Sequence, residues 1–104
     1  MKDYLTIGST PANEDCFPAG HPLARAETRI YRDQLAREFP TADLRVKGFP
    51  HDFGTYYEVV VYYDTECEQS IETAYAIESD ANGEWDPIAV KELKALKKAH
   101  LEAS

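Results

Sequence analysis

The chain has 104 residues, a length that suits one domain and allows an ordinary hydrophobic core. Its composition, 43% hydrophobic and 12% aromatic, excludes disordered, collagen-like and low-complexity proteins. No apolar run approaches the length that spans a bilayer, and the N-terminal segment lacks the apolar block of a signal peptide. We therefore expect a single cytoplasmic domain over residues 1–104, with no membrane association.

The formal net charge of -8 is concentrated in one segment. Between Asp64 and Asp86 the chain has many carboxylates and neither lysine nor arginine, so this window accounts for the whole net charge. Such a run is usually the solvated face of a helix, and the alternative is an electrostatic surface for a basic partner. Duplex nucleic acid is not an expected partner, because the densest cationic cluster is only the lysines between residues 91 and 98.

The first part of the chain predicts a strand, a long loop and a helix. Residues 3–9 alternate in polarity and end at Gly8 and Pro11, a pattern typical of a short strand. Residues 10–21 are rich in Pro, Gly, Asn and Asp and have no period, which predicts a loop. A helix is expected over residues 22–39, since Pro22 suits a first helical position and Pro40 ends the pattern.

The predicted helix over residues 22–39 has a wide and irregular apolar side. Its main stripe consists of residues at three- and four-residue spacings: Ala24, Thr28, Tyr31, Leu35 and Phe39. Leu23 and Ile30 lie off this stripe, with Glu27 and Gln34 between them, so either apolar residue is a candidate for exposure. The arginines, Arg25, Arg29, Arg32 and Arg37, are expected on the solvated side.

Residues 44–64 predict a β-hairpin. Its strands are expected at 43–48 and 55–63, with a turn over residues 50–54. Alternation in the second strand places Tyr57, Val59, Val61 and Tyr63 on one face and Tyr56, Glu58, Val60 and Tyr62 on the other. Both faces are largely apolar, which is typical of a central strand or of one whose outer face is covered.

Two further helices are predicted. Thr65 followed by Glu68 indicates a capping box for a helix over residues 66–79, on which Cys67 would be a small buried hydrophobe. Asp86 before Pro87 is a strong start signal for a helix over residues 87–102.

The element order β-α-β-β-α-α predicts an α+β fold. We expect a three-stranded mixed sheet in the order 1-3-2, a truncated ferredoxin-like arrangement with the helices packed on one face. The first and second strands should run parallel, as in a right-handed crossover, and the third should lie between them because it is the most apolar.

The residues that carry chemistry do not form a complete site. His51 and Asp52 are adjacent, but neighbouring residues seldom form an oriented acid–base pair, and Asp52 fits a role in the bend instead. Cys16, His21 and His51 offer three mixed metal ligands at a spacing that matches no zinc pattern. We therefore expect no catalytic residue, no resident metal and no cofactor.

The best functional candidate in the sequence is a surface. Tyr56, Val60 and Tyr62 should line the sheet face opposite the helices, beside Arg45 and Lys47 of the neighbouring strand, and tyrosine with arginine is typical of interface hot spots. The competing interpretation is that the long loop or the last helix covers this face. The acidic segment provides a second candidate surface through Glu66, Glu68 and Glu72.

Two stretches carry a resemblance: YLTIGSTPANEDC at 4–16 and RVKGFPHDFGTYYEVVVYYD at 45–64. There the chain resembles a family of small uncharacterised proteins that recur in bacteriophages, prophages and bacterial genomes, with similarity from Tyr4 to Trp85. The resemblance implies a cytoplasmic setting and a tie to mobile DNA, but no activity. The helix over residues 87–102 departs from the family's shorter pattern.

These observations lead to three hypotheses of function. The first is a non-enzymatic interaction module that binds a protein of unknown identity, or a second copy of itself, through the tyrosine-rich face or the acidic segment. The second is an acidic decoy that imitates DNA and inhibits a host nucleic-acid enzyme. The third is a small metal-dependent enzyme that uses Cys16, His21, His51 and Asp52.

Overall fold

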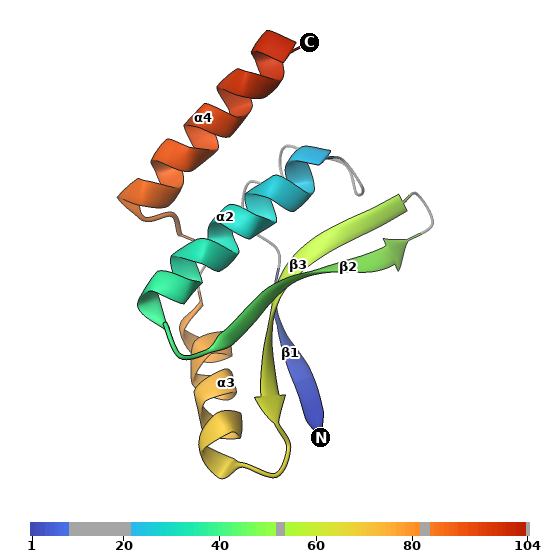
Figure 1. The fold of residues 1–104 in the computed structure, drawn as a ribbon, viewed down its shortest axis with the longest axis vertical. Coiled ribbons are helices and arrows are strands. Elements are labelled where there is room, and N and C mark those ends of the chain that lie inside the picture. Colours follow the sequence, from blue (N-terminus) through green and yellow to red (C-terminus); the bar gives the residue numbers. More distant parts are fainter. Residues whose placement is uncertain (9–21, 52–53, 82–83, 104) are drawn as a thin grey trace.

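The computed structural model describes residues 1–8, 22–51, 54–81 and 84–103 (Figure 1). Within these ranges, no helix has the length and apolar character needed to cross a membrane. The predicted order β-α-β-β-α-α is confirmed, while the predicted loop over residues 10–21 lies outside the described ranges. The elements are β1 (Lys2–Gly8), α2 (Pro22–Glu38), β2 (Asp43–His51), β3 (Gly54–Asp64), α3 (Glu68–Asp80) and α4 (Pro87–Ala103).

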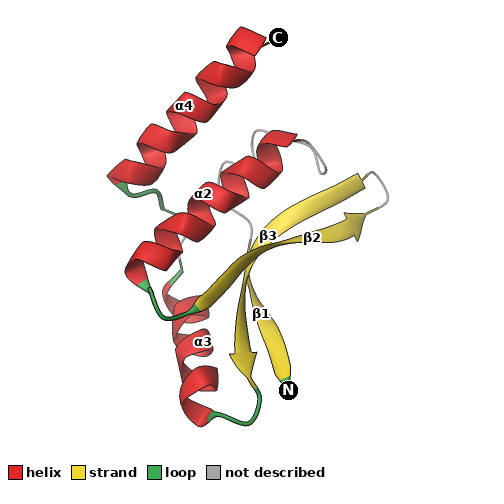
Figure 2. Cartoon of the chain, in the orientation of Figure 1, coloured by secondary structure: helices red, strands yellow, loops and turns green. Residues whose placement is uncertain are grey.

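The three strands form an open sheet in the predicted order, β1-β3-β2. β3 is antiparallel to both neighbours, so every hydrogen-bonded pair in the sheet is antiparallel. β1 and β2 run in the same direction on either side of β3, as predicted. The central position of β3 agrees with its apolar run, because a central strand packs against the core on one face and has cross-strand neighbours on both sides on the other. Figure 2 shows the helices grouped to one side of the strands.

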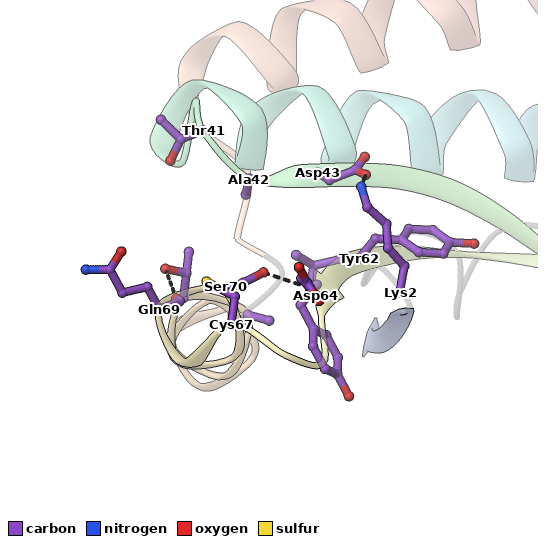
Figure 3. A pocket seen from close by; sticks show the side chains of 13 residues that line it. Lys2, Thr41, Ala42, Asp43, Tyr62, Asp64, Cys67, Gln69 and Ser70 are labelled. Atoms are coloured by element: carbon purple, nitrogen blue, oxygen red, sulfur yellow. Dashed lines mark hydrogen bonds and ion pairs between the residues drawn. The ribbon is translucent and has the colours of Figure 1, made fainter.

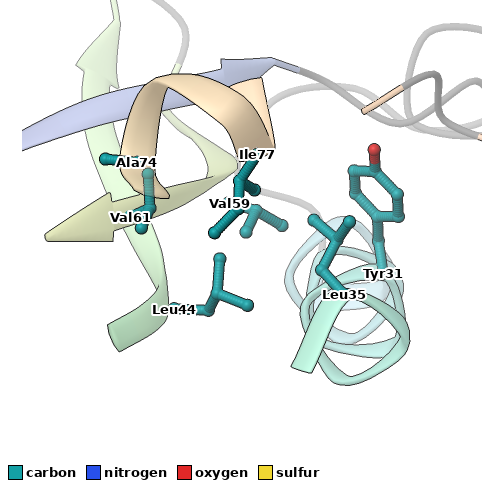
Figure 4. Packing of buried hydrophobic residues seen from close by; sticks show 7 residues of the cluster. All are labelled: Tyr31, Leu35, Leu44, Val59, Val61, Ala74 and Ile77. Carbon is teal, nitrogen blue, oxygen red and sulfur yellow. The ribbon is translucent and has the colours of Figure 1, made fainter. Parts of the chain in front are cut away.

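The core lies between the sheet and the two helices that contact it, α2 and α3. Val59 and Val61 project from β3 onto this side, as the alternation predicted, and Leu44 projects beside them from β2. Figure 4 shows the other members of the cluster closing over them: Tyr31 and Leu35 from α2, and Ala74 and Ile77 from α3. The sequence pattern therefore identified the buried face of the central strand correctly.

α2 buries more of its surface than its main stripe suggests. Leu23 and Ile30, which the sequence left as candidates for exposure, are both buried, and so is the carboxyl group of Glu27. The reason is α4, which packs against α2 and covers a second side of it. Along the predicted stripe, the Thr28 hydroxyl donates a hydrogen bond of 2.7 Å to the carbonyl oxygen of Ala24, so this polar residue is buried with a partner.

The start of α4 is fixed by its N-cap and by contacts to α2. The predicted cap is confirmed, since the Ala89 amide donates to Asp86 Oδ1 at 2.7 Å. The same carboxylate pairs with the Arg37 guanidinium, with Nη2 at 2.8 Å from each carboxylate oxygen. Gln34 completes the junction by donating to the Glu84 carbonyl oxygen and accepting from the Asp86 amide. α4 is thus attached to α2 rather than to the sheet.

The start of α3 differs from the prediction. The helix begins at Glu68, its N-cap residue is Cys67, and no side chain caps it. The capping-box prediction is wrong because the Thr65 hydroxyl instead donates to the carbonyl oxygen of Met1 at 2.9 Å, next to the first strand. The predicted burial of Cys67 is also wrong: it precedes the helix and its side chain is exposed.

Gly48 is required by the ring of Tyr57, its partner across β2 and β3. A methyl group at position 48 would lie 2.9 Å from Thr55 Cγ2 and 3.1 Å from Tyr57 Cε1. We expect Gly48→Ala to lower the free energy of unfolding by about 1–3 kcal/mol, the usual cost of overpacking, as measured by urea denaturation. Adding Thr55→Ser removes the nearest methyl group and should recover part of the loss. Equal stability of Gly48→Ala and the native protein would contradict this explanation.

Candidate functional site

The sheet face opposite the core gathers the predicted surface residues. Alternation and register place Tyr56, Val60 and Tyr62 of β3 on this face, with Arg45 and Lys47 of β2 beside them. Two further aromatic residues, Tyr4 of β1 and Phe49 of β2, lie on the same face, because Tyr4 pairs with Tyr62 and Phe49 pairs with Tyr56. The sheet therefore unites residues from all three strands.

The four rings form one continuous cluster. Tyr4 contacts Tyr62 at a centroid distance of 5.6 Å and Phe49 at 6.4 Å. Phe49 in turn stacks on Tyr56 at 5.5 Å with an interplanar angle of 25°. These distances are those of favourable aromatic pairs. We call the surface formed by these rings and the two adjacent cations the aromatic face: Tyr4, Arg45, Lys47, Phe49, Tyr56 and Tyr62.

Both cations of the aromatic face lie over rings. The guanidinium carbon of Arg45 is 4.6 Å from the centroid of Tyr62, and Lys47 Nζ is 5.1 Å from that of Tyr4. Asp43 orients Arg45 through hydrogen bonds of 2.9 and 3.0 Å, which lower the pKa of Asp43 and raise that of Arg45. Arg45 is therefore held in place, with a charged group at the edge of an apolar surface.

The surface beneath the rings is buried. Val60 is 0% exposed, so it supports the aromatic face from beneath and does not itself offer contact area. Glu58 also belongs to this face, and burial raises the pKa of its carboxyl group. It pairs directly with Lys47 across β2 and β3. The accessible surface thus consists of rings and cations rather than aliphatic side chains.

No described helix covers the aromatic face. α2 and α3 pack on the other side of the sheet, and α4 contacts only α2 among the described elements. The competing prediction that the last helix folds over this face is therefore not met. The other competing prediction concerned the loop over residues 10–21, which lies outside the described ranges.

Sequence reasoning missed Tyr4 and Phe49 as members of the site. Phe49 lies beyond the predicted end of the strand at residue 48, whereas β2 continues to His51. Tyr4 shows the right alternation but is brought to Tyr62 only by the pairing of β1 with β3. The available signal was the predicted strand order 1-3-2, which already places the first strand next to the third.

The acidic segment forms a separate surface. Glu66, Glu68 and Glu72 are all exposed at the start of α3. Near this helix end lies a cavity of about 380 Å³ at the end of the sheet (Figure 3), with Asp43, Cys67 and Ser70 in its lining. The Ser70 hydroxyl accepts a hydrogen bond from the Asp64 amide, and Asp43 pairs with Lys2. The polar groups around this cavity are thus engaged with one another.

The predicted catalytic and metal candidates are not brought together within the described ranges. Cys16, His21 and Asp52 lie outside them, and His51 is the last residue of β2. Among the residues that are described, no group of three side chains is arranged to hold a metal ion. The aromatic face is therefore the best-defined candidate site.

Comparison of the chain with protein-family models, with curated proteins and with solved structures found no match.

Proposed function

We propose that this protein is a non-enzymatic interaction module that binds another protein through its aromatic face. The observation that carries the proposal is the continuous cluster of four rings and two cations on a sheet face that no described helix covers. Tyrosine and arginine are the residues most enriched in binding hot spots, and rigid rings supply contact area at low cost in conformational entropy. The suggested tie to phage or prophage genomes rests on the sequence resemblance alone.

The charges of the aromatic face indicate what kind of partner it accepts. Arg45 and Lys47 stand beside the rings, each over the face of one of them. A partner surface with exposed carboxylates and apolar groups would match this combination. Pairing of two identical faces would bring like charges together, so a different protein fits better than a second copy.

The double variant Tyr56→Ala/Tyr62→Ala tests the proposal. We expect it to lower affinity for the partner in host lysate by about a hundredfold or more, since hot-spot tyrosines contribute roughly 2 kcal/mol or more each and every 1.4 kcal/mol is about tenfold. The matched control is Tyr75→Ala, which removes a tyrosine of α3 that is 49% exposed. Urea denaturation of each variant separates loss of binding from loss of fold. Unchanged partner capture and unchanged sedimentation of the double variant would rule out the aromatic face.

The alternative function, an acidic mimic of DNA, is favoured by one observation. Glu66, Glu68 and Glu72 are exposed together at one helix end. A decoy of this kind would bind a basic nucleic-acid enzyme with an affinity that falls steeply with salt and is lost on reversal of these three charges. The aromatic variants would then bind normally, so the two functions give opposite results in the same assay.

A further inference from the structure

β2 is an open edge of the sheet, and the direction of its peptide groups can be assigned. Pro50 pairs with Thr55 but has no amide hydrogen, so its nitrogen must face away from β3. Peptide groups alternate in direction along a strand, and Leu44, Val46 and Gly48 therefore face outward as well. The Leu44 carbonyl agrees with this, since it accepts a hydrogen bond of 2.8 Å from Arg32 Nε of α2 instead of from β3.

Among the described residues, Val46 and Gly48 form the part of this edge that no other strand pairs with. No backbone hydrogen bond other than the ladder to β3 involves either residue among the described parts of the chain. The pairing of β2 with β3 is also regular over its whole length, without a shift of register. The opposite edge is different, because a shift of register between Thr6 and Gly8 interrupts β1. An irregular edge resists addition of a further strand and a regular one permits it.

A basic groove adjoins β2 at Val46. It has a volume of about 340 Å³ and is lined by Arg25, Ala26 and Arg29 of α2 and by Val46 of β2. Both arginine side chains are exposed, and neither is held in an ion pair within the described ranges. α2 runs beside the β2–β3 hairpin (Figure 1), and Arg25 and Arg29 of α2 line the same groove as Val46 of β2.

We propose that an extended acidic segment of a partner protein binds at this edge as a fourth strand next to β2. Its backbone would pair with the outward peptide groups of Val46 and Gly48. Alternate side chains would enter the groove, where carboxylates meet Arg25 and Arg29. The site stands whether or not the aromatic face binds a partner, because its groove and backbone contacts involve neither Tyr56 nor Tyr62.

Charge and hydrogen bonding argue against two other occupants. A second copy that paired its own β2 with this one would bring identical arginines together, which is unfavourable. A nucleic-acid strand has no backbone amide donors to match the outward carbonyl groups of β2, whereas a peptide backbone supplies both donors and acceptors. An acidic peptide satisfies both the charge and the hydrogen-bonding pattern.

The test uses ten-residue peptides in which Glu or Asp alternates with Val, Thr or Tyr. We expect at least one of them to bind the full chain and to slow hydrogen exchange of the Val46 and Gly48 amides, as followed by NMR. A version of that peptide with N-methyl groups on alternate residues keeps the charges but cannot pair, and should not bind. The variant Arg25→Ala/Arg29→Ala should weaken binding about tenfold or more, because charge-assisted hydrogen bonds are lost.

The matched control is Lys91→Ala/Lys94→Ala, which removes the same charge from exposed positions of α4. It should leave peptide affinity unchanged, as should Tyr56→Ala/Tyr62→Ala. The proposal is overturned if no peptide slows exchange at Val46 and Gly48, or if the N-methylated peptide binds equally well. It is also overturned if the lysine control loses as much affinity as the arginine variant, or if a ten-nucleotide oligothymidylate binds with the same dependence on Arg25 and Arg29.

Discussion

Replacing Ile77 with alanine is expected to lower the free energy of unfolding by about 2–5 kcal/mol, the largest loss that we predict for a single substitution. Ile77 is 0% exposed, and it and Ala74 are the buried residues of α3. Since α3 is otherwise largely exposed, Ile77 supplies most of the apolar contact that holds this helix on the sheet (Figure 4). Urea denaturation measures the loss, and amide exchange in α3 should rise more than in α2.

The matched control for Ile77 is another isoleucine. Ile88 on α4 is 52% exposed, so Ile88→Ala removes the same atoms without opening a cavity. We expect a change within about 0.5 kcal/mol, as for ordinary surface substitutions. If the two alanine variants have similar stability, α3 is not held on the sheet in the way that the packing indicates.

The second large effect concerns Glu27, whose carboxyl group is buried on α2 and finds no hydrogen-bond partner for either oxygen among the residues that the structure describes. Burial raises its pKa from the ordinary value of 4.5 to about 7, and Lys97 of α4 opposes this by a smaller amount. Because the folded chain binds this proton more tightly than the unfolded chain does, the associated stabilisation is complete below pH 4.5 and is lost as the pH rises through 7. The loss amounts to about 3 kcal/mol at pH 8.

Glu27→Met should remove this pH dependence. The variant has an apolar side chain of similar length, so we expect it to exceed the native protein in stability by up to about 3 kcal/mol at pH 8 and to match it near pH 4.5. Urea denaturation at intervals between these pH values gives the difference between the two profiles, in which the other titrating groups cancel. As a control, Glu78→Met at an exposed position of α3 should leave the pH dependence of the free energy of unfolding unchanged. If the free energy of unfolding changed with pH in the same way for Glu27→Met and the native protein, ionisation of Glu27 would not destabilise the fold.

The fold could be predicted where local physics and tertiary packing agree. The alternation of Tyr57, Val59 and Val61 required a covered central strand, and the Asp86-Pro87 pair is a helix start in almost any context. These signals produced the strand order and the position of the last helix. They depend on neighbours in the sequence, so no knowledge of distant contacts was needed.

Other features depended on contacts between distant segments. Glu27 is buried because α4 returns to pack on α2, and nothing within residues 22–39 shows which side a later helix will cover. Thr65 was expected to cap its own helix but binds the carbonyl oxygen of Met1, whose position is set by the pairing of β1 with β3. Local rules supply the candidate partners of a polar group, and tertiary structure chooses among them.

The candidate site was likewise predictable only in part from local sequence. Tyr56 and Tyr62 could be placed on the outer face from the period of one strand, and Arg45 and Lys47 followed from the hairpin. The ring contacts that join Tyr4 and Phe49 to them needed the full register of the sheet. The sequence placed Arg25 and Arg29 only on the solvated side of a helix. It could not show the basic groove, because Val46, which also lines it, belongs to a different element.

The central claim is that the aromatic face is the surface that binds a partner, and site-specific photocrosslinking tests it most directly. A benzophenone amino acid would replace Tyr56 on the aromatic face in one sample and Tyr75 on α3 in another, since both positions carry an aromatic ring already. After irradiation in host lysate, we expect a discrete crosslinked protein from position 56 and none from position 75. A crosslink from position 75 alone would assign binding to the acidic side of the molecule and contradict the account.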